Sequence, residues 1–286
     1  MRSAPLAGGA LTLVLLAGCG SPDPQTGGED GVSVVTTSHP LQFTAEAVAG
    51  DRAAVTSVLA AGDDSHGTEV STRQVAEMVD ADVVVHLSGL QPAIDDALDA
   101  RPPQHLVDAA RYADDDRDPH FWLDPLRMAS LGRDVAGELA EVDPDGAAEY
   151  RAGADRFAGE MERLDAHYAS ALAGCRDAAL VTSHEAFGYL AQRYGLRQIG
   201  IAGVDPEVEP SPARVRDVME VARENSVTTV FFEETANPAV ADKLARDLGV
   251  RTAVLHPVER VAEGQDYLSL MRENLEALRT GLNCSA

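Results

Sequence analysis

The chain has 286 residues, of which 45% are hydrophobic and 24% charged, and its formal net charge at pH 7 is -24. This length allows two medium α/β domains with filled cores, and the hydrophobic content excludes disorder for most of the chain. The negative charge disfavours nucleic acid and anionic membrane surfaces as partners.

The first 18 residues have the features of an export signal. An arginine precedes an apolar run, 6–17, that is too short for a membrane span of about 20 residues. The run ends in Leu16–Cys19 (Leu-Ala-Gly-Cys), which resembles a bacterial lipobox, where cleavage precedes an acylated cysteine. We therefore predict a signal peptide at 1–18, a lipid anchor on Cys19 and a flexible tether at 19–31.

The two remaining cysteines are expected to pair. Once Cys19 is acylated, Cys175 and Cys284 are the only cysteines left. Exported proteins form disulfides because their surroundings are oxidising. A bridge between these positions would close most of the C-terminal half and leave no cysteine for a Cys-only metal site.

From Val32 onward, short apolar runs alternate with helical segments, which is typical of parallel βαβ units. Strands are predicted at 32–37, 53–60, 81–87, 178–183, 198–202, 228–232 and 252–255. Helices are predicted at 41–49, 72–79, 125–139, 186–194, 212–224, 238–248 and 267–280. An acidic surface loop is expected at 108–118.

The longest predicted helix covers 147–172. Its apolar residues repeat at intervals of three, four and seven along one stripe. A helix of this length would reach roughly 39 Å, more than one small lobe needs. The predicted fold class is therefore α/β, with an N-terminal lobe at 32–146 and a C-terminal lobe at 173–286 joined by one long rigid helix.

Four of the eight histidines lie in turns or directly after predicted strands. His66 lies in Gly-Asp-Asp-Ser-His-Gly, His184 and His256 directly follow strands, and His120 lies in Asp-Pro-His-Phe-Trp-Leu-Asp-Pro, which its prolines hold extended. Ligands of open α/β sheets bind where strands end. Neutral imidazoles suit zinc, so the sequence predicts a zinc site in the cleft between the lobes.

These motifs, together with the lipobox, Thr-Ser-His-Glu-Ala-Phe-Gly-Tyr-Leu and Val-Leu-His-Pro-Val-Glu, resemble the zinc and manganese solute-binding proteins of bacterial ABC importers, the ZnuA-like family. The resemblance runs from about Val32 to the C-terminus and implies metal ligands at His66, His120 and His184. It also implies an extracytoplasmic protein, lipid-anchored to the outer face of the cell membrane, that delivers Zn2+ to an ABC permease. We expect a monomer.

The resemblance leaves the fourth ligand open. The family's fourth motif has Asp before Pro and, in many zinc binders, Glu three residues later. Here His256 and Glu259 occupy those positions, and either one completes the site. Manganese-binding relatives tend to use two carboxylates, so the histidines here favour Zn2+ over Mn2+. Glu185, next to His184, is a candidate for orienting an imidazole.

Three alternative functions remain. A manganese carrier and a surface adhesin would use the same fold. A zinc hydrolase is less favoured because the chain has no His-Glu-x-x-His motif, no Gly-x-Ser-x-Gly elbow and no glycine-rich phosphate loop. We therefore predict a metal carrier and not an enzyme.

Overall fold

The structure is a computed structural model that describes residues 31–60, 62–63, 65–66, 70–114, 117–206, 208–233, 239–262, 264–282 and 284. The predicted signal peptide, the lipid anchor on Cys19 and nearly all of the tether lie outside these residues. In the part of the chain that is described, no helix combines the length and the apolar character that crossing a membrane requires.

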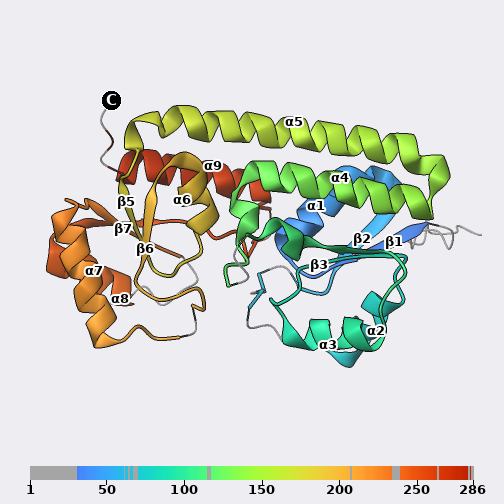
Figure 1. Ribbon diagram of the computed structural model, residues 1–286, viewed down its shortest axis with the longest axis horizontal. Helices are drawn as coiled ribbons and strands as arrows, with labels where there is room; N and C mark the ends of the chain where they lie inside the picture. Colours follow the sequence, from blue (N-terminus) through green and yellow to red (C-terminus); the bar gives the residue numbers. More distant parts are fainter. Residues whose placement is uncertain are drawn as a thin grey trace, which may run out of the picture. The chain divides into compact units, whose positions relative to one another are not determined.

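Two four-stranded sheets form the framework, and every strand pair in them is parallel (Figure 1). The first sheet has the order β2-β1-β3-β4, from β1 (Val32–Thr36), β2 (Ala53–Ser57), β3 (Val83–His86) and β4 (Leu106–Asp108). The second has the order β6-β5-β7-β8, from β5 (Ala179–Thr182), β6 (Arg197–Gly200), β7 (Thr229–Phe232) and β8 (Arg251–Val254). The predicted α/β class is confirmed, and both lobes repeat one strand order.

Helices connect the strands and follow the last one. They are α1 (His39–Ala49), α2 (Thr72–Val79), α3 (Pro92–Ala100), α4 (Pro125–Val142), α5 (Ala147–Ala171), α6 (Gly188–Tyr194), α7 (Pro212–Glu224), α8 (Ala239–Leu248) and α9 (Tyr267–Gly281). Crossover helices bury a parallel sheet, which explains its apolar sequence; Val83, Val84 and Val85 of β3 are all fully buried. Helix α3 and strand β4 were not predicted, and the expected loop at 108–118 begins with a 3-10 turn, Ala109–Tyr112.

The long helix α5 packs along α4 and α1 and also reaches α9, so it contacts elements from both ends of the chain (Figure 1). Its apolar stripe faces inward, as the predicted spacing requires. At Gly153 the helix comes very close to α1, because a Cβ there would lie 2.3 Å from the carbonyl oxygen of Val48. Glycine therefore lets the two backbones touch.

A disulfide joins Cys175 and Cys284. Cys175 is buried in a 3-10 turn just after α5, and Cys284 follows the end of α9. The bridge therefore fastens the C-terminal end of the second lobe to the end of the long helix.

Candidate metal centre

Three of the predicted ligands meet at one point. His66 Nε2 lies 3.4 Å from His120 Nε2 and 3.1 Å from Glu259 Oε1, and His120 Nε2 lies 2.6 Å from the same carboxylate oxygen. Two ligand atoms on a tetrahedral zinc, each 2.0–2.1 Å from the metal, are about 3.3–3.4 Å apart. The three atoms, from segments far apart in the sequence, are therefore close enough to share one ion.

His184 reaches the same centre from the second lobe. Its ring centroid lies 5.5 Å from that of His120. One ring nitrogen of His184 and one carboxylate oxygen each of Glu233 and Glu259 all lie within 4.8 Å of one another. His66, His120 and Glu259 form another group of this kind, so Glu259 belongs to both. The Nε2 atom of His184 is buried and has no hydrogen-bond partner among the described residues. A buried nitrogen of this kind needs a partner, and a metal ion would supply one.

Carboxylates orient two of the imidazoles. Asp118 Oδ1 lies 2.7 Å from His120 Nδ1, and Glu233 accepts a hydrogen bond from His184 Nδ1. A carboxylate that accepts from one ring nitrogen fixes the tautomer, leaves the other nitrogen for a metal and raises its basicity. Both histidines are therefore prepared to bind through Nε2.

Strong electrostatic coupling links His120 and Glu259. Burial opposes a charge on His120, but hydrogen bonds with Asp118 and Glu259 outweigh burial and raise the pKa of His120 to about 9. Burial also opposes the charge on Glu259, yet hydrogen bonds with His120 and His66 hold the pKa of its carboxyl well below the usual range. Without metal, the proton on His120 therefore neutralises Glu259.

The fold explains why these residues converge. His184 lies two residues after the end of β5 and Glu233 directly follows β7, and these strands are neighbours in the second sheet. In such sheets, neighbouring strands whose connections run in opposite directions leave a crevice at their C-terminal ends. His120 precedes the 3-10 turn Phe121–Leu123 that leads into α4. The two lobes therefore present their ligands to each other.

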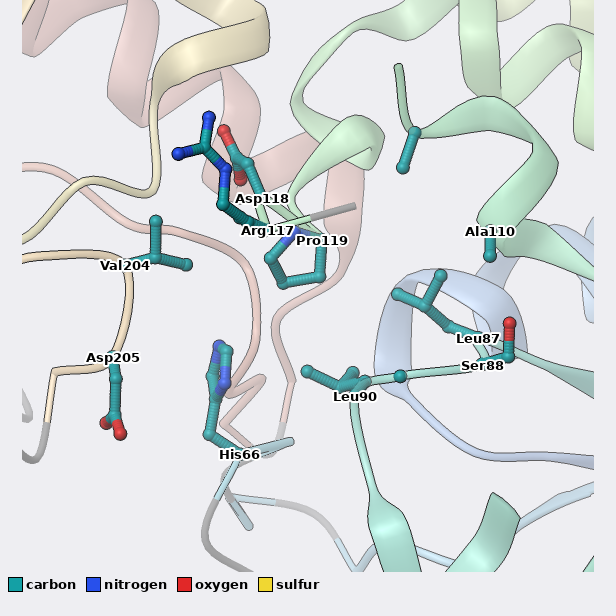
Figure 2. Close-up of a pocket in the computed structure, with 12 residues that line it drawn as sticks. His66, Leu87, Ser88, Leu90, Ala110, Arg117, Asp118, Pro119, Val204 and Asp205 are labelled. Atoms are coloured by element: carbon teal, nitrogen blue, oxygen red, sulfur yellow. The ribbon is translucent and has the colours of Figure 1, made fainter. Parts of the chain in front are cut away.

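A pocket of about 580 Å3 opens beside this centre. His66 lies in its wall, between Leu90 of the first lobe and Val204 and Asp205 of the second (Figure 2). The side chain of His66 is 15% exposed, whereas that of His120 is fully buried. His66 thus borders both the centre and this pocket.

Two residues singled out from the sequence lie elsewhere. The ring of His256 is not part of the cluster, because its Nε2 lies 3.4 Å from Glu273 Oε2. The carboxylate of Glu185 pairs with Arg214 at 2.8 Å and orients no imidazole. Glu233 takes that place. The sequence signal for Glu233 is its position directly after the predicted strand at 228–232, which matches the position of His184 after its own predicted strand.

Glu233→Gln is expected to weaken zinc binding by roughly 10–100-fold, the usual effect of losing a carboxylate behind a metal-binding histidine. A neutral amide would hold His184 less firmly and make its Nε2 less basic. Glu185→Gln is the matched control, because Glu185 is a neighbouring acid whose carboxylate accepts a hydrogen bond from Arg214. Competition titration against a zinc chelator measures both affinities. Equal affinities for the two variants would contradict the assigned role of Glu233.

Comparison with known proteins finds zinc-binding relatives of this chain. The family model described as "ZnuA: Zinc-uptake complex component A periplasmic" matches residues 34–281. The zinc-binding lipoprotein AdcA of Streptococcus pneumoniae is 32% identical over 307 residues, covering 98% of this chain and 61% of that protein. The chain thus spans about three-fifths of the length of this relative.

Two solved structures share the fold. The laminin-binding protein Lbp of Streptococcus pyogenes superposes with a TM-score of 0.80 at 34% identity, covering 88% of this chain and 100% of that one. The Zn(II)-bound ZnuA-like domain of Streptococcus pneumoniae AdcA gives 0.76 at 33% identity, covering 88% of this chain and 98% of that one.

Proposed function

This chain belongs to the ZnuA family of zinc-uptake components, and we propose that it binds Zn2+ outside the cytoplasm and delivers it to an ABC-type membrane permease. The observation that carries the proposal is the convergence of His66, His120 and Glu259 on one point, with His184 beside them. The similarity to a Zn(II)-bound domain supports the same metal.

In this proposal the ligands are His66 and His120 from the first lobe and His184 and Glu259 from the second. Three imidazoles and one carboxylate complete a tetrahedral zinc site. Manganese prefers oxygen ligands, so a set with a single carboxylate favours Zn2+ over Mn2+. His256 has no part in binding the ion, because its side chain points to Glu273.

The nearby carboxylates argue for a carrier and against a zinc hydrolase. A hydrolase needs an open metal position and a carboxylate free to act as a general base. Here Glu259 contacts His66 and His120, and Glu233 holds His184. With Asp118, which pairs with His120, all three of these acids are thus engaged with the histidines of the centre.

We further propose that the protein is lipid-anchored outside the cytoplasm. The Leu-Ala-Gly-Cys sequence ending at Cys19 supports a lipid anchor on the outer face of the cell membrane. The family description supports a permease as the partner. We propose that the protein acts as a monomer, since one chain supplies all four ligands.

Titration of zinc and, separately, manganese into metal-stripped protein beginning at Ser21 tests the proposal. We expect tight one-to-one zinc binding and much weaker manganese binding. Deletion of the gene should slow growth in zinc-poor medium, and added zinc should restore it. Correctly folded protein without tight zinc binding would overturn the proposal.

Zinc binding near pH 7.5 is expected to release about one proton, because zinc accepts only the neutral imidazole. The raised pKa of His120, about 9, means that this ring is protonated before zinc arrives. Zinc affinity should therefore rise as the pH increases toward 9 and then level off. Calorimetry in buffers with different ionisation enthalpies counts the protons. Heats that do not depend on the buffer would contradict the expectation.

Adhesion to a host matrix protein is the second candidate function, since the structure also resembles the laminin-binding protein Lbp. Laminin binding that persists in a variant unable to bind zinc would favour an adhesive surface separate from the metal centre. Loss of zinc-dependent growth in the same variant would still establish uptake. The two functions can therefore be separated experimentally.

A further inference from the structure

Asn274 of α9 fastens the backbone of His256, three residues before Glu259. Its Oδ1 accepts a hydrogen bond from the His256 N–H at 2.7 Å, and its Nδ2 donates to the His256 carbonyl, also at 2.7 Å. Asn274 is fully buried. The amide uses one acceptor and one donor on the same residue, so only one amide orientation satisfies both bonds. The chain leaving β8 is therefore locked to α9.

Trp122 anchors Pro257, the residue after His256. Its Nε1–H donates to the carbonyl oxygen of Pro257 at 2.7 Å, and the Tyr267 hydroxyl donates to the carbonyl of Trp122 at 2.6 Å. Trp122 lies only two residues after His120. The segments that carry His120 and Glu259 are thus joined by a hydrogen bond that requires no metal.

Val258 stands between this anchored segment and Glu259. Its φ angle is 63°, in the left-handed region that β-branched residues rarely adopt. Its side chain is only 1% exposed and packs in the main core. A strained backbone of this kind persists only where its surroundings impose it. The unusual turn determines the direction in which the Glu259 side chain leaves the chain.

We infer that Asn274 and Trp122 are positioning residues, which impose the left-handed turn at Val258 and so hold the Glu259 carboxylate in place for zinc. The inference rests on the proposed zinc-binding function and assigns to these two residues control of how long zinc stays bound. If either anchor is lost, Val258 relaxes toward negative φ and turns the carboxylate away from His66 and His120. Zinc then leaves faster, although every ligand is still present in the chain.

The test measures the rate at which zinc leaves preloaded protein when a chromophoric chelator is added in a stopped-flow instrument. Asn274→Ala is expected to raise the rate roughly 10–100-fold, the range typical of residues that support metal ligands. Trp122→Phe, which keeps an aromatic ring but removes the Nε1–H, should raise it less. Leu278→Ala is the matched control, since Leu278 is also fully buried in α9 but makes none of these hydrogen bonds.

The control separates positioning from general loss of stability. Melting curves of the metal-free proteins should show all three variants folded, with Leu278→Ala destabilised but releasing zinc at the wild-type rate. Wild-type release rates in both Asn274→Ala and Trp122→Phe would overturn the inference, as would an equal acceleration in Leu278→Ala. Failure of the wild-type protein to bind zinc is a different result, which removes the proposed function and the inference with it.

Discussion

Glu259→Ala is expected to weaken zinc binding by roughly 100-fold or more, because removing one partner from a buried charged site costs about 3–5 kcal/mol. Glu259 Oε1 lies 3.1 Å from His66 Nε2 and 2.6 Å from His120 Nε2, and Glu259 is 1% exposed. Its loss leaves the positive ion with three neutral ligands. Competition titration against chelators of graded affinity gives the dissociation constant.

His256→Ala is the matched control for Glu259→Ala and should change the affinity by less than about threefold, as expected for a side chain away from the ion. Only the backbone of His256 takes part in the anchored segment, and alanine retains that backbone. Strong loss of zinc affinity in His256→Ala with little loss in Glu259→Ala would reverse the assignment of the fourth ligand.

Metal-free Glu259→Ala should also have a lower melting temperature than wild type, since the buried His120 loses the carboxylate that stabilises its proton.

The sequence alone could not choose between His256 and Glu259. The two residues are three positions apart in a loop, where no hydrophobic periodicity indicates which side chain faces inward. The choice depends on the left-handed turn at Val258, and that turn depends on Asn274 and Trp122, which are distant in the sequence. By contrast, His184 was predictable because it lies just beyond the end of an apolar strand, β5, and strand ends mark ligand sites.

The fold was predictable where segments were long. The stripe along α5 and the strands of both lobes follow from periodicity and apolar runs. Two elements of the first lobe were missed because their local signals are weak. Helix α3 has only nine residues and buries only two of them, and β4 has three residues at the edge of the first sheet. Such short elements form because neighbours pack on them, which local propensity does not reveal.

Replacement of both Cys175 and Cys284 by alanine is expected to lower the free energy of unfolding by about 4–5 kcal/mol, because the bridge restricts the unfolded chain. The bridge spans a sequence separation of 109 residues, which includes the whole second lobe. For a domain of this size the melting temperature should fall by roughly 10 °C. Thermal unfolding of metal-free protein, followed by circular dichroism, measures the change. Reductant should lower the melting temperature of wild type and leave that of the variant unchanged.

Zinc should stabilise the protein with and without the bridge by the same amount. A ligand that binds only the folded state adds a stabilisation set by its concentration and dissociation constant. The disulfide acts on the unfolded chain, whereas zinc acts at a site whose second-lobe residues, His184, Glu233 and Glu259, are held by β5, β7 and the anchored loop. Equal zinc-induced shifts in unfolding free energy would show that the native site is independent of the bridge. A smaller shift in the double variant would instead show that the bridge also shapes the metal centre.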